Sequence, residues 1–153
     1  MGLSQNKYRV QETDPDFLVE KFVNQMMWGG KKTVSRRILS DAFKTIADKT
    51  KKDPKKVFEE AIRNVSPAVE VRPRRVGGSV YQIPMQVKPH RQRSLAFRWL
   101  IGAARNKSGA AMAQKLATEL MEAAENQGAA IKKKEDAHRM AESNKAFAHF
   151  ARY

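Results

Sequence analysis

The side chains of this chain that could carry chemistry are three histidines and a large excess of cations. His138 and His149 are 11 positions apart, a spacing that places both on one face of a continuous helix. Lys134 and Lys145 fall on the same face, and a cation-rich face without paired carboxylates disfavours a metal ion. The sequence has no cysteine, which excludes disulfides and thiol catalysis. We therefore expect no catalytic residue, no metal site, no cofactor and no enzymatic activity.

The net charge is the strongest feature of the composition. Of 153 residues, 30 are Lys or Arg and 16 are Asp or Glu, which gives a net charge of +14. Residues 21–107 hold 21 of the basic side chains and 6 of the acidic ones, a net charge of +15. Such a protein concentrates polyanions at its surface, so we expect a nucleic acid as partner. The longest uncharged segment, residues 76–87, is shorter than the roughly 20 residues of a membrane span.

Arginines and aromatic rings in the middle of the chain are candidate contacts with that nucleic acid. Guanidinium groups bind phosphate through two parallel hydrogen bonds, and aromatic rings stack on bases. Tyr81 and Trp99 could stack, although the helical spacing of Trp99 relative to its apolar neighbours is more typical of a core residue. Residues 31–37 hold a second basic cluster, for which phosphate contact is favoured over a merely solvated helix start. No zinc-finger, homeodomain or RNP motif is present.

Apolar residues at helical spacing predict six helices. These helices begin near residues 15, 33, 54, 94, 109 and 129, and the last is expected to continue to His149. On the last helix Met140, Ala141 and Phe147 are predicted to face the core. A polar stripe beside them is predicted to hold Lys134, His138, Lys145, His149 and Arg152. A phosphate near this stripe would raise the pKa of His138.

Residues 69–87 alternate in polarity and predict a β-hairpin around Gly77 and Gly78. No Lys-Ser/Thr pair follows these glycines, so they are interpreted as a turn and not as a phosphate-binding loop. A two-residue loop would place charged residues opposite apolar ones, whereas a three-residue loop, Gly77 to Ser79, gives one apolar face. We therefore expect the three-residue loop. Pro73 and Pro84 cannot donate ladder hydrogen bonds, which favours a protruding two-stranded ribbon over a wide sheet.

The sequence thus predicts a mainly α fold, a six-helix bundle with a protruding two-stranded β-hairpin arm. Residues 1–153 are expected to form a single domain, in which residues 1–13 are a flexible N-terminal tail and residues 69–87 are the arm. The tail belongs to a segment, residues 1–20, with a net charge of −2.

Several motifs, in this order and spacing, resemble the bacterial-type small-subunit ribosomal protein of the seventh family. They are Gly30-Lys31-Lys32, Arg74-Arg75-Val76-Gly77-Gly78, Tyr81-Gln82-Ile83-Pro84, Arg98-Trp99-Leu100, Ala103-Ala104-Arg105, Met112-Ala113, Lys115-Leu116, Lys132-Lys133-Lys134-Glu135, His138-Arg139-Met140-Ala141-Glu142 and Asn144 to Phe150. The resemblance covers roughly residues 15–153. Family members usually open with a basic tail, from which the acidic residues 1–20 depart.

The resemblance implies a structural protein of the small ribosomal subunit, located in the ribosome of a bacterial cytoplasm or of an organelle. It implies binding to the 3′ major domain of small-subunit rRNA, nucleation of head assembly, and a position near the exit-site tRNA and the mRNA path. Neighbouring head and platform proteins are the other implied partners. The arm residues expected near tRNA and mRNA are Arg74, Arg75, Val76, Gly77, Gly78, Ser79 and Tyr81.

The predicted rRNA contacts combine the basic clusters with the residues that match the family. They are Lys31, Lys32, Arg36, Arg37, Arg72, Arg74, Arg75, Arg91, Arg93, Arg98, Arg105, Lys115, Lys132, Lys133, His138, Arg139 and Lys145. Charge alone would equally allow a DNA-compacting architectural protein, which is the alternative. An RNA-processing enzyme is disfavoured because neither a carboxylate pair nor a metal-ligand cluster is found.

Overall fold

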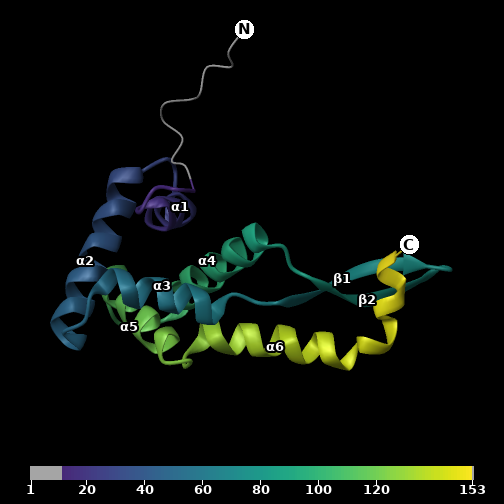
Figure 1. Ribbon diagram of the computed structural model, residues 1–153. Coiled ribbons are helices and arrows are strands. Elements are labelled where there is room, and N and C mark those ends of the chain that lie inside the picture. Colours follow the sequence, from purple (N-terminus) through teal and green to yellow (C-terminus); the bar gives the residue numbers. More distant parts are fainter. Residues whose placement is uncertain (1–11, 153) are drawn as a thin grey trace, which may run out of the picture.

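Residues 12–152 are described by the structure, a computed structural model shown in Figure 1. The elements are α1 (Phe17–Met26), α2 (Lys32–Thr50), α3 (Pro54–Val65), β1 (Val69–Val76), β2 (Ser79–Gln86), α4 (Pro89–Asn106), α5 (Met112–Ala124), α6 (Ala129–Ser143) and the 3-10 helix η1 (Lys145–Arg152). The mainly α fold with a two-stranded hairpin arm is confirmed. The predicted flexible tail, residues 1–13, lies almost wholly outside the described residues.

The hydrophobic core lies among α1 to α5 and the start of α6. The ring of Phe22 meets the rings of Phe58 and Phe97 edge to face, each with its centroid 5.2 Å away. These rings come from α1, α3 and α4, so the contacts join three helices at one point. Trp99 packs half-buried against this core, as its helical spacing indicated. Within the described residues, no helix combines the length and apolarity needed to cross a bilayer.

Three predicted helix starts need correction, among them the fifth, which lies at Met112 and not near residue 109. The first helix begins at Phe17 with Asp16 before it, because the Asp14 carbonyl accepts the Phe17 N–H in a preceding turn. The fourth begins at Pro89, five positions before the expected start at Ser94. Proline is favoured in a first helical turn, where its missing N–H leaves no unpaired donor, and this outweighs the capping preference of serine.

The predicted three-residue hairpin loop is wrong. Val76 pairs with Ser79 and Arg74 with Tyr81, which leaves Gly77 and Gly78 as a two-residue loop. Both glycines have positive φ, +59° and +88°, as a type I′ turn requires. Turn geometry therefore outweighs the single apolar face that favoured the longer loop. This register places two charged side chains opposite apolar ones, Glu70 opposite Met85 and Arg72 opposite Ile83, and both are accommodated by ion pairs.

The predicted continuous helix over residues 129–149 is also wrong. α6 ends at Ser143, where the side chains of Ser143 and Asn144 both donate to the Met140 carbonyl oxygen. After Asn144 the chain turns into η1, which rises across the hairpin (Figure 1). Consequently Lys134 and His138 lie on a different helix from Lys145 and His149, and the predicted five-residue stripe is divided. Met140, expected in the core, is 49% exposed.

The arm is braced along part of its length and is not a free ribbon. α6 runs alongside β1, and η1 packs on β2 (Figure 1). The Tyr81 ring lies 5.1 Å from that of Phe147 and 5.3 Å from that of Phe150, measured between centroids. Arg74 Nη1 donates to the carbonyl oxygens of Phe150, at 3.2 Å, and Ala151, at 3.4 Å. The C-terminal segment therefore fixes one face of the arm.

Candidate nucleic-acid interface

The first basic cluster, residues 31–37, lies at the start of α2. Lys32 Nζ and Arg36 Nη2 both lie 3.2 Å from Glu20 Oε2 on α1. The hydrogen bond from Arg36 lowers the pKa of the Glu20 carboxyl. Lys31 and Arg37 are exposed, and their side chains have no hydrogen bond or ion pair among residues 12–152. The cluster thus holds two neutralised cations and two that are available to an anion.

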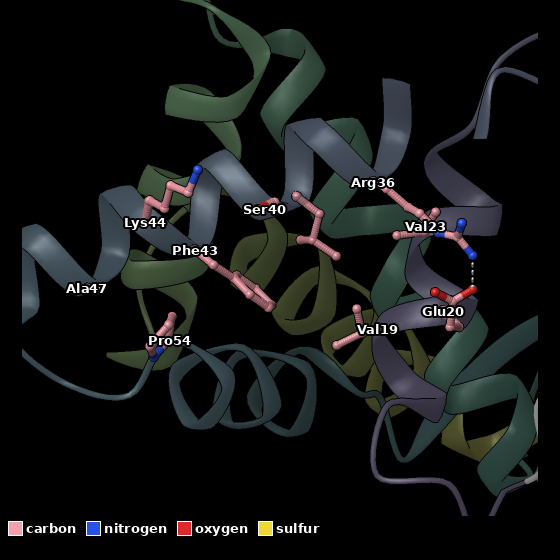
Figure 2. Close-up of a pocket in the computed structure, with 10 residues that line it drawn as sticks. Val19, Glu20, Val23, Arg36, Ser40, Phe43, Lys44, Ala47 and Pro54 are labelled. Carbon is pink, nitrogen blue, oxygen red and sulfur yellow. Dashed lines mark hydrogen bonds and ion pairs between the residues drawn. The ribbon is translucent and has the colours of Figure 1, made fainter. Parts of the chain in front are cut away.

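A cavity of about 370 Å³ lies beside this cluster, between α1, α2 and Pro54. Figure 2 shows Val19 and Phe43 in its wall and the Arg36–Glu20 pair at its edge. Its lining contains no histidine, and its single carboxylate, Glu20, is already paired with two cations. The lining therefore offers neither a general base nor metal ligands.

The base of the arm holds a second group of cations around Glu70. Glu70 Oε1 lies 2.7 Å from Arg72 Nη2 and 3.1 Å from Arg91 Nε. Burial would raise the pKa of Glu70, but hydrogen bonds from Arg91 and Arg72 outweigh it and lower the pKa. Arg93 pairs with Glu12, and its guanidinium lies 4.7 Å from the Phe17 ring centroid. The Arg91–Glu70 pair thus links α4 to the arm, whereas Arg93 holds residues before and at the start of α1 against α4.

We expect the Glu70 ion pairs to make stability depend on pH. Because the pKa of Glu70 is lower in the folded chain, the stabilisation is complete above the unfolded-state value of about 4.3 and disappears as pH falls through the folded-state value. Between about pH 6 and about pH 3, wild type should therefore lose up to about 1 kcal/mol more unfolding free energy than Glu70→Gln. Urea denaturation of both proteins measures this difference, and parallel curves would contradict it.

Arg74 and Arg75, neighbours on β1, have different surroundings. Arg74 is half-buried against η1, whereas Arg75 is exposed and has no side-chain partner among residues 12–152. Ser79 is exposed as well, and Tyr81 is half-buried beneath η1. Of the predicted arm contacts, Arg75, the loop glycines and Ser79 are thus accessible and Val76 is half-buried, while Arg74 and Tyr81 hold the C-terminal segment.

Substituting these two arginines should separate the two roles. Arg74→Ala should speed amide hydrogen exchange in residues 145–152 by about tenfold or more, because a hydrogen bond from a charged group contributes about 1.5–3 kcal/mol. Arg75→Ala removes the same charge without touching η1 and should leave exchange there unchanged. Equal exchange in the two variants would show that Arg74 does not hold the C-terminal segment.

The predicted contacts on α4 and α5 are also unequal. Arg98 is exposed without a side-chain partner among the described residues. Arg105 Nη2 donates to the Met26 carbonyl oxygen at 2.9 Å, and its guanidinium lies 5.3 Å from the Trp28 ring centroid. Lys115 is half-buried and lines a polar cleft together with Lys49 and Lys107.

The predicted contacts of the C-terminal region divide between α6 and η1. Lys132 and Lys133 are exposed and have no side-chain partner within the described chain. Arg139 pairs with Asp136, and Lys145 Nζ lies 3.5 Å from Glu142 Oε1. The α6 surface thus combines available cations with cations that already have acidic partners.

His138 differs from the expectation of an imidazole that readily gains a proton. Its Nε2 accepts a hydrogen bond from the Ala68 N–H at 3.1 Å, an interaction that only an unprotonated nitrogen can accept. Burial, and then the charge of Lys134, lower its pKa. In the unbound protein both effects favour the neutral form of His138, which attaches α6 to the segment before β1. The direction of this pKa shift is opposite to the one predicted for contact with phosphate.

The sequence did not lead us to predict two features of the structure. Trp28 is 74% exposed, and Glu119 is fully buried with an ion pair to Lys107. A signal for Trp28 was present, because it follows Met26 by two positions and so falls off the apolar stripe of α1. For Glu119 the sequence offered no such signal, since its partners come from other elements.

A helical bundle with a hairpin arm and many exposed cations is typical of the class of basic nucleic-acid-binding proteins. The chain belongs to the family described as ribosomal protein S7p/S5e, whose profile matches residues 3–145. It is 56% identical over 135 residues to small ribosomal subunit protein uS7 of Thermotoga maritima, covering 88% of this chain and 87% of the relative. The protein of the same name from Thermoanaerobacter sp. strain X514 is 55% identical over 132 residues, 86% of this chain and 85% of the relative. The family resemblance of the sequence motifs is thereby confirmed.

Proposed function

We propose that this chain is a structural protein of the small ribosomal subunit that binds small-subunit rRNA. The observation that carries the proposal is 55–56% identity, over most of the chain, to bacterial proteins named small ribosomal subunit protein uS7. The family is one of ribosomal proteins and not of enzymes. The net charge of +14 supports a polyanionic partner.

The finer proposal concerns where the chain binds and what it does there. It binds the 3′ major domain of the rRNA, nucleates assembly of the head, and places its arm near the exit-site tRNA and the mRNA path. Neighbouring head and platform proteins are its further partners. Phosphate contact is supported by exposed cations that have no partner in the described chain and that lie on α2, β1, α4, α6 and the connection before α2. These cations are Lys31, Arg37, Arg75, Arg98, Lys132 and Lys133.

Cations that are already paired can contribute to the same interface in another way. Lys32, Arg36, Arg72 and Arg91 neutralise carboxylates within the protein, so each also reduces repulsion between those carboxylates and phosphate. We assign the remaining predicted contacts to the proposed interface as well: Arg74, Arg93, Arg105, Lys115, His138, Arg139 and Lys145. They combine internal contacts or half-burial with positions beside accessible cations.

A competition experiment tests this function against the alternative of a DNA-compacting protein. Labelled small-subunit rRNA is bound to the protein, and unlabelled 3′ major domain RNA or duplex DNA of equal phosphate concentration is added. We expect the RNA domain to displace the label at concentrations at least 1,000-fold lower than the duplex, the lower end of specific over non-specific binding. Equal displacement by both competitors would favour the architectural DNA-binding protein.

A further inference from the structure

The connection between α1 and α2, residues 27–31, carries an aromatic ring with no place in the core. Trp28 is 74% exposed, more than any other large apolar side chain among the described residues. Exposing an indole to this extent leaves much apolar surface in water. Single exposed apolar residues are common, so exposure alone assigns no role. The surroundings of Trp28 provide the further observations.

An arginine holds one side of the indole. The guanidinium carbon of Arg105 lies over the Trp28 ring, 5.3 Å from its centroid. Arg105 is itself anchored, because its Nη2 donates to the Met26 carbonyl oxygen at 2.9 Å. The contact thus links α4 to the end of α1 and orients the ring. With one face under the guanidinium and three-quarters of the side chain exposed, the opposite face is open to solvent.

The hollow beside the indole is apolar inside and cationic at its edge. It has a volume of about 210 Å³. Its lining residues are Met26, Met27, Trp28, Lys31, Val34, Ser35, Ile38, Arg105 and Met112. No carboxylate is among them, and Ser35 is turned inward, donating to the Val23 carbonyl oxygen at 2.8 Å. The two charged side chains of the lining, Lys31 and Arg105, are both positive.

We propose that Trp28 is a stacking platform for one unpaired nucleobase of the bound RNA. The base stacks on the open face of the indole, while Arg105 lies against the other face and Lys31 contacts a flanking phosphate. Base–aromatic stacking together with cations that follow the backbone is how proteins hold single-stranded nucleic acid. This inference rests on the proposed function and names a subsite within it that sequence reasoning did not assign.

The charges favour RNA over a protein as the occupant of this surface. An apolar protein surface packed on Trp28 would cover Lys31 and Arg105 without providing an anion, and burying unpaired charges is costly. A nucleotide provides both parts at once, a flat ring for the indole and a phosphate for the lysine. The adjoining Arg37 is also exposed and available to the next phosphates along the strand.

Fluorescence can test the stacking directly because the chain has only two tryptophans. Trp99→Phe leaves Trp28 as the single indole. The fluorescence of this variant is measured while small-subunit rRNA, a short single-stranded oligoadenylate or inorganic polyphosphate is added. We expect quenching by the first two probes and none by polyphosphate, which has the charge but no bases. Quenching of equal depth by polyphosphate would overturn the stacking.

Affinity measurements on three variants provide the second arm. Trp28→Ala should weaken rRNA binding by roughly 5- to 150-fold. Trp28→Phe should weaken it much less, because the phenyl ring still stacks. Val34→Ala changes the same hollow without removing a ring and should have no measurable effect on binding. Thermal melting of each variant checks that the fold is unchanged. If wild type binds the rRNA specifically while Trp28→Ala binds equally well and no quenching occurs, the stacking platform is wrong and the proposed function stands.

Two other results would contradict the proposals in different ways. Failure of wild type to distinguish the rRNA from duplex DNA would overturn the proposed function and this inference together. Oxidation of the Trp28 side chain can be compared in the complex with rRNA alone and in the assembled subunit. Protection only in the assembled subunit would assign this surface to a neighbouring protein and contradict stacking on a nucleobase.

Discussion

Replacing Glu119 with Ala should lower the free energy of unfolding by about 3–5 kcal/mol, because it leaves a buried N–H without an acceptor and a cavity in place of the side chain. Glu119 is fully buried on α5. Its Oε1 accepts the Ala130 N–H at 2.9 Å, and its Oε2 lies 3.2 Å from Lys107 Nζ. The carboxylate therefore joins the start of α6 and the α4–α5 connection to α5. Chemical denaturation of the folded variant measures the loss.

Glu119 belongs to a small network of charged side chains that includes Lys107 and Glu122. Lys107 Nζ also lies 2.8 Å from Glu122 Oε2. Burial alone would lower the pKa of Lys107, but the hydrogen bonds to Glu122 and Glu119 raise it. Gly128, at φ +96°, fits closely over these carboxylates, since a Cβ there would lie 2.9 Å from Glu122 Oε2 and 3.1 Å from Glu119 Oε1. The Ala130 N–H is buried, so removing its carboxylate acceptor would leave a buried donor unpaired.

Glu119→Gln is the matched control because it keeps the size and the acceptor for Ala130. It loses only the charge facing Lys107, so we expect a smaller cost of about 1–3 kcal/mol. Both variants should keep the RNA affinity of wild type once folded, since Glu119 is inaccessible to any ligand. Equal losses for Ala and Gln would mean that the charge, and not the cap on α6, provides the stability.

The helical core could be predicted from the sequence because its signals are local. Phe22, Ile46 and Phe58 each belong to an apolar stripe of their own helix, and all three are fully buried. The Asp53-Pro54 start was confirmed as well, with Asp53 Oδ1 accepting the Lys55 N–H at 3.1 Å. In these segments the periodicity, the cap and the proline agree, and no contact with a distant segment opposes them.

Distant contacts decided the segments where the prediction was wrong. The hairpin register depends on the turn geometry and on Arg91 of α4, which neutralises Glu70. The end of α6 depends on the arm, where Tyr81 offers a surface for Phe147 and Phe150 once the chain has turned. A helical wheel has no information on either partner, because it assumes a straight helix and a uniform environment.

The same distinction applies to the candidate site. Residue type predicted which side chains are cationic, but only the fold shows which of them already have partners. Arg74 and Arg75 are adjacent and chemically identical, yet one binds backbone carbonyls of η1 and the other is exposed. Trp28 and Trp99 are distinguished in the same way, by position relative to the apolar stripe and not by type.

Raising the salt concentration from about 50 to about 200 mM should weaken rRNA binding by roughly 10³- to 10⁵-fold if six to ten phosphates are contacted. The expectation rests on the net charge of +15 in residues 21–107. Each phosphate neutralised by Lys or Arg releases counterions, so the slope of log affinity against log salt counts the contacts. Filter binding across this range measures the slope, and an affinity independent of salt would contradict the electrostatic account.

Removing three of the available cations tests whether they are among those contacts. Arg37, Arg75 and Lys132 lie on α2, β1 and α6, are exposed, and have no side-chain partner among residues 12–152. Their triple replacement by Ala should reduce the slope by about 2 to 3, roughly one for each contact. The matched control replaces three other exposed cations with no such partner, Lys52, Lys56 and Arg63, which lie outside the proposed interface. Because both triple variants lose the same net charge, a reduced slope in the first alone assigns the effect to contact. Equal slopes would instead mean that the overall charge of the protein, and not these three positions, attracts the RNA.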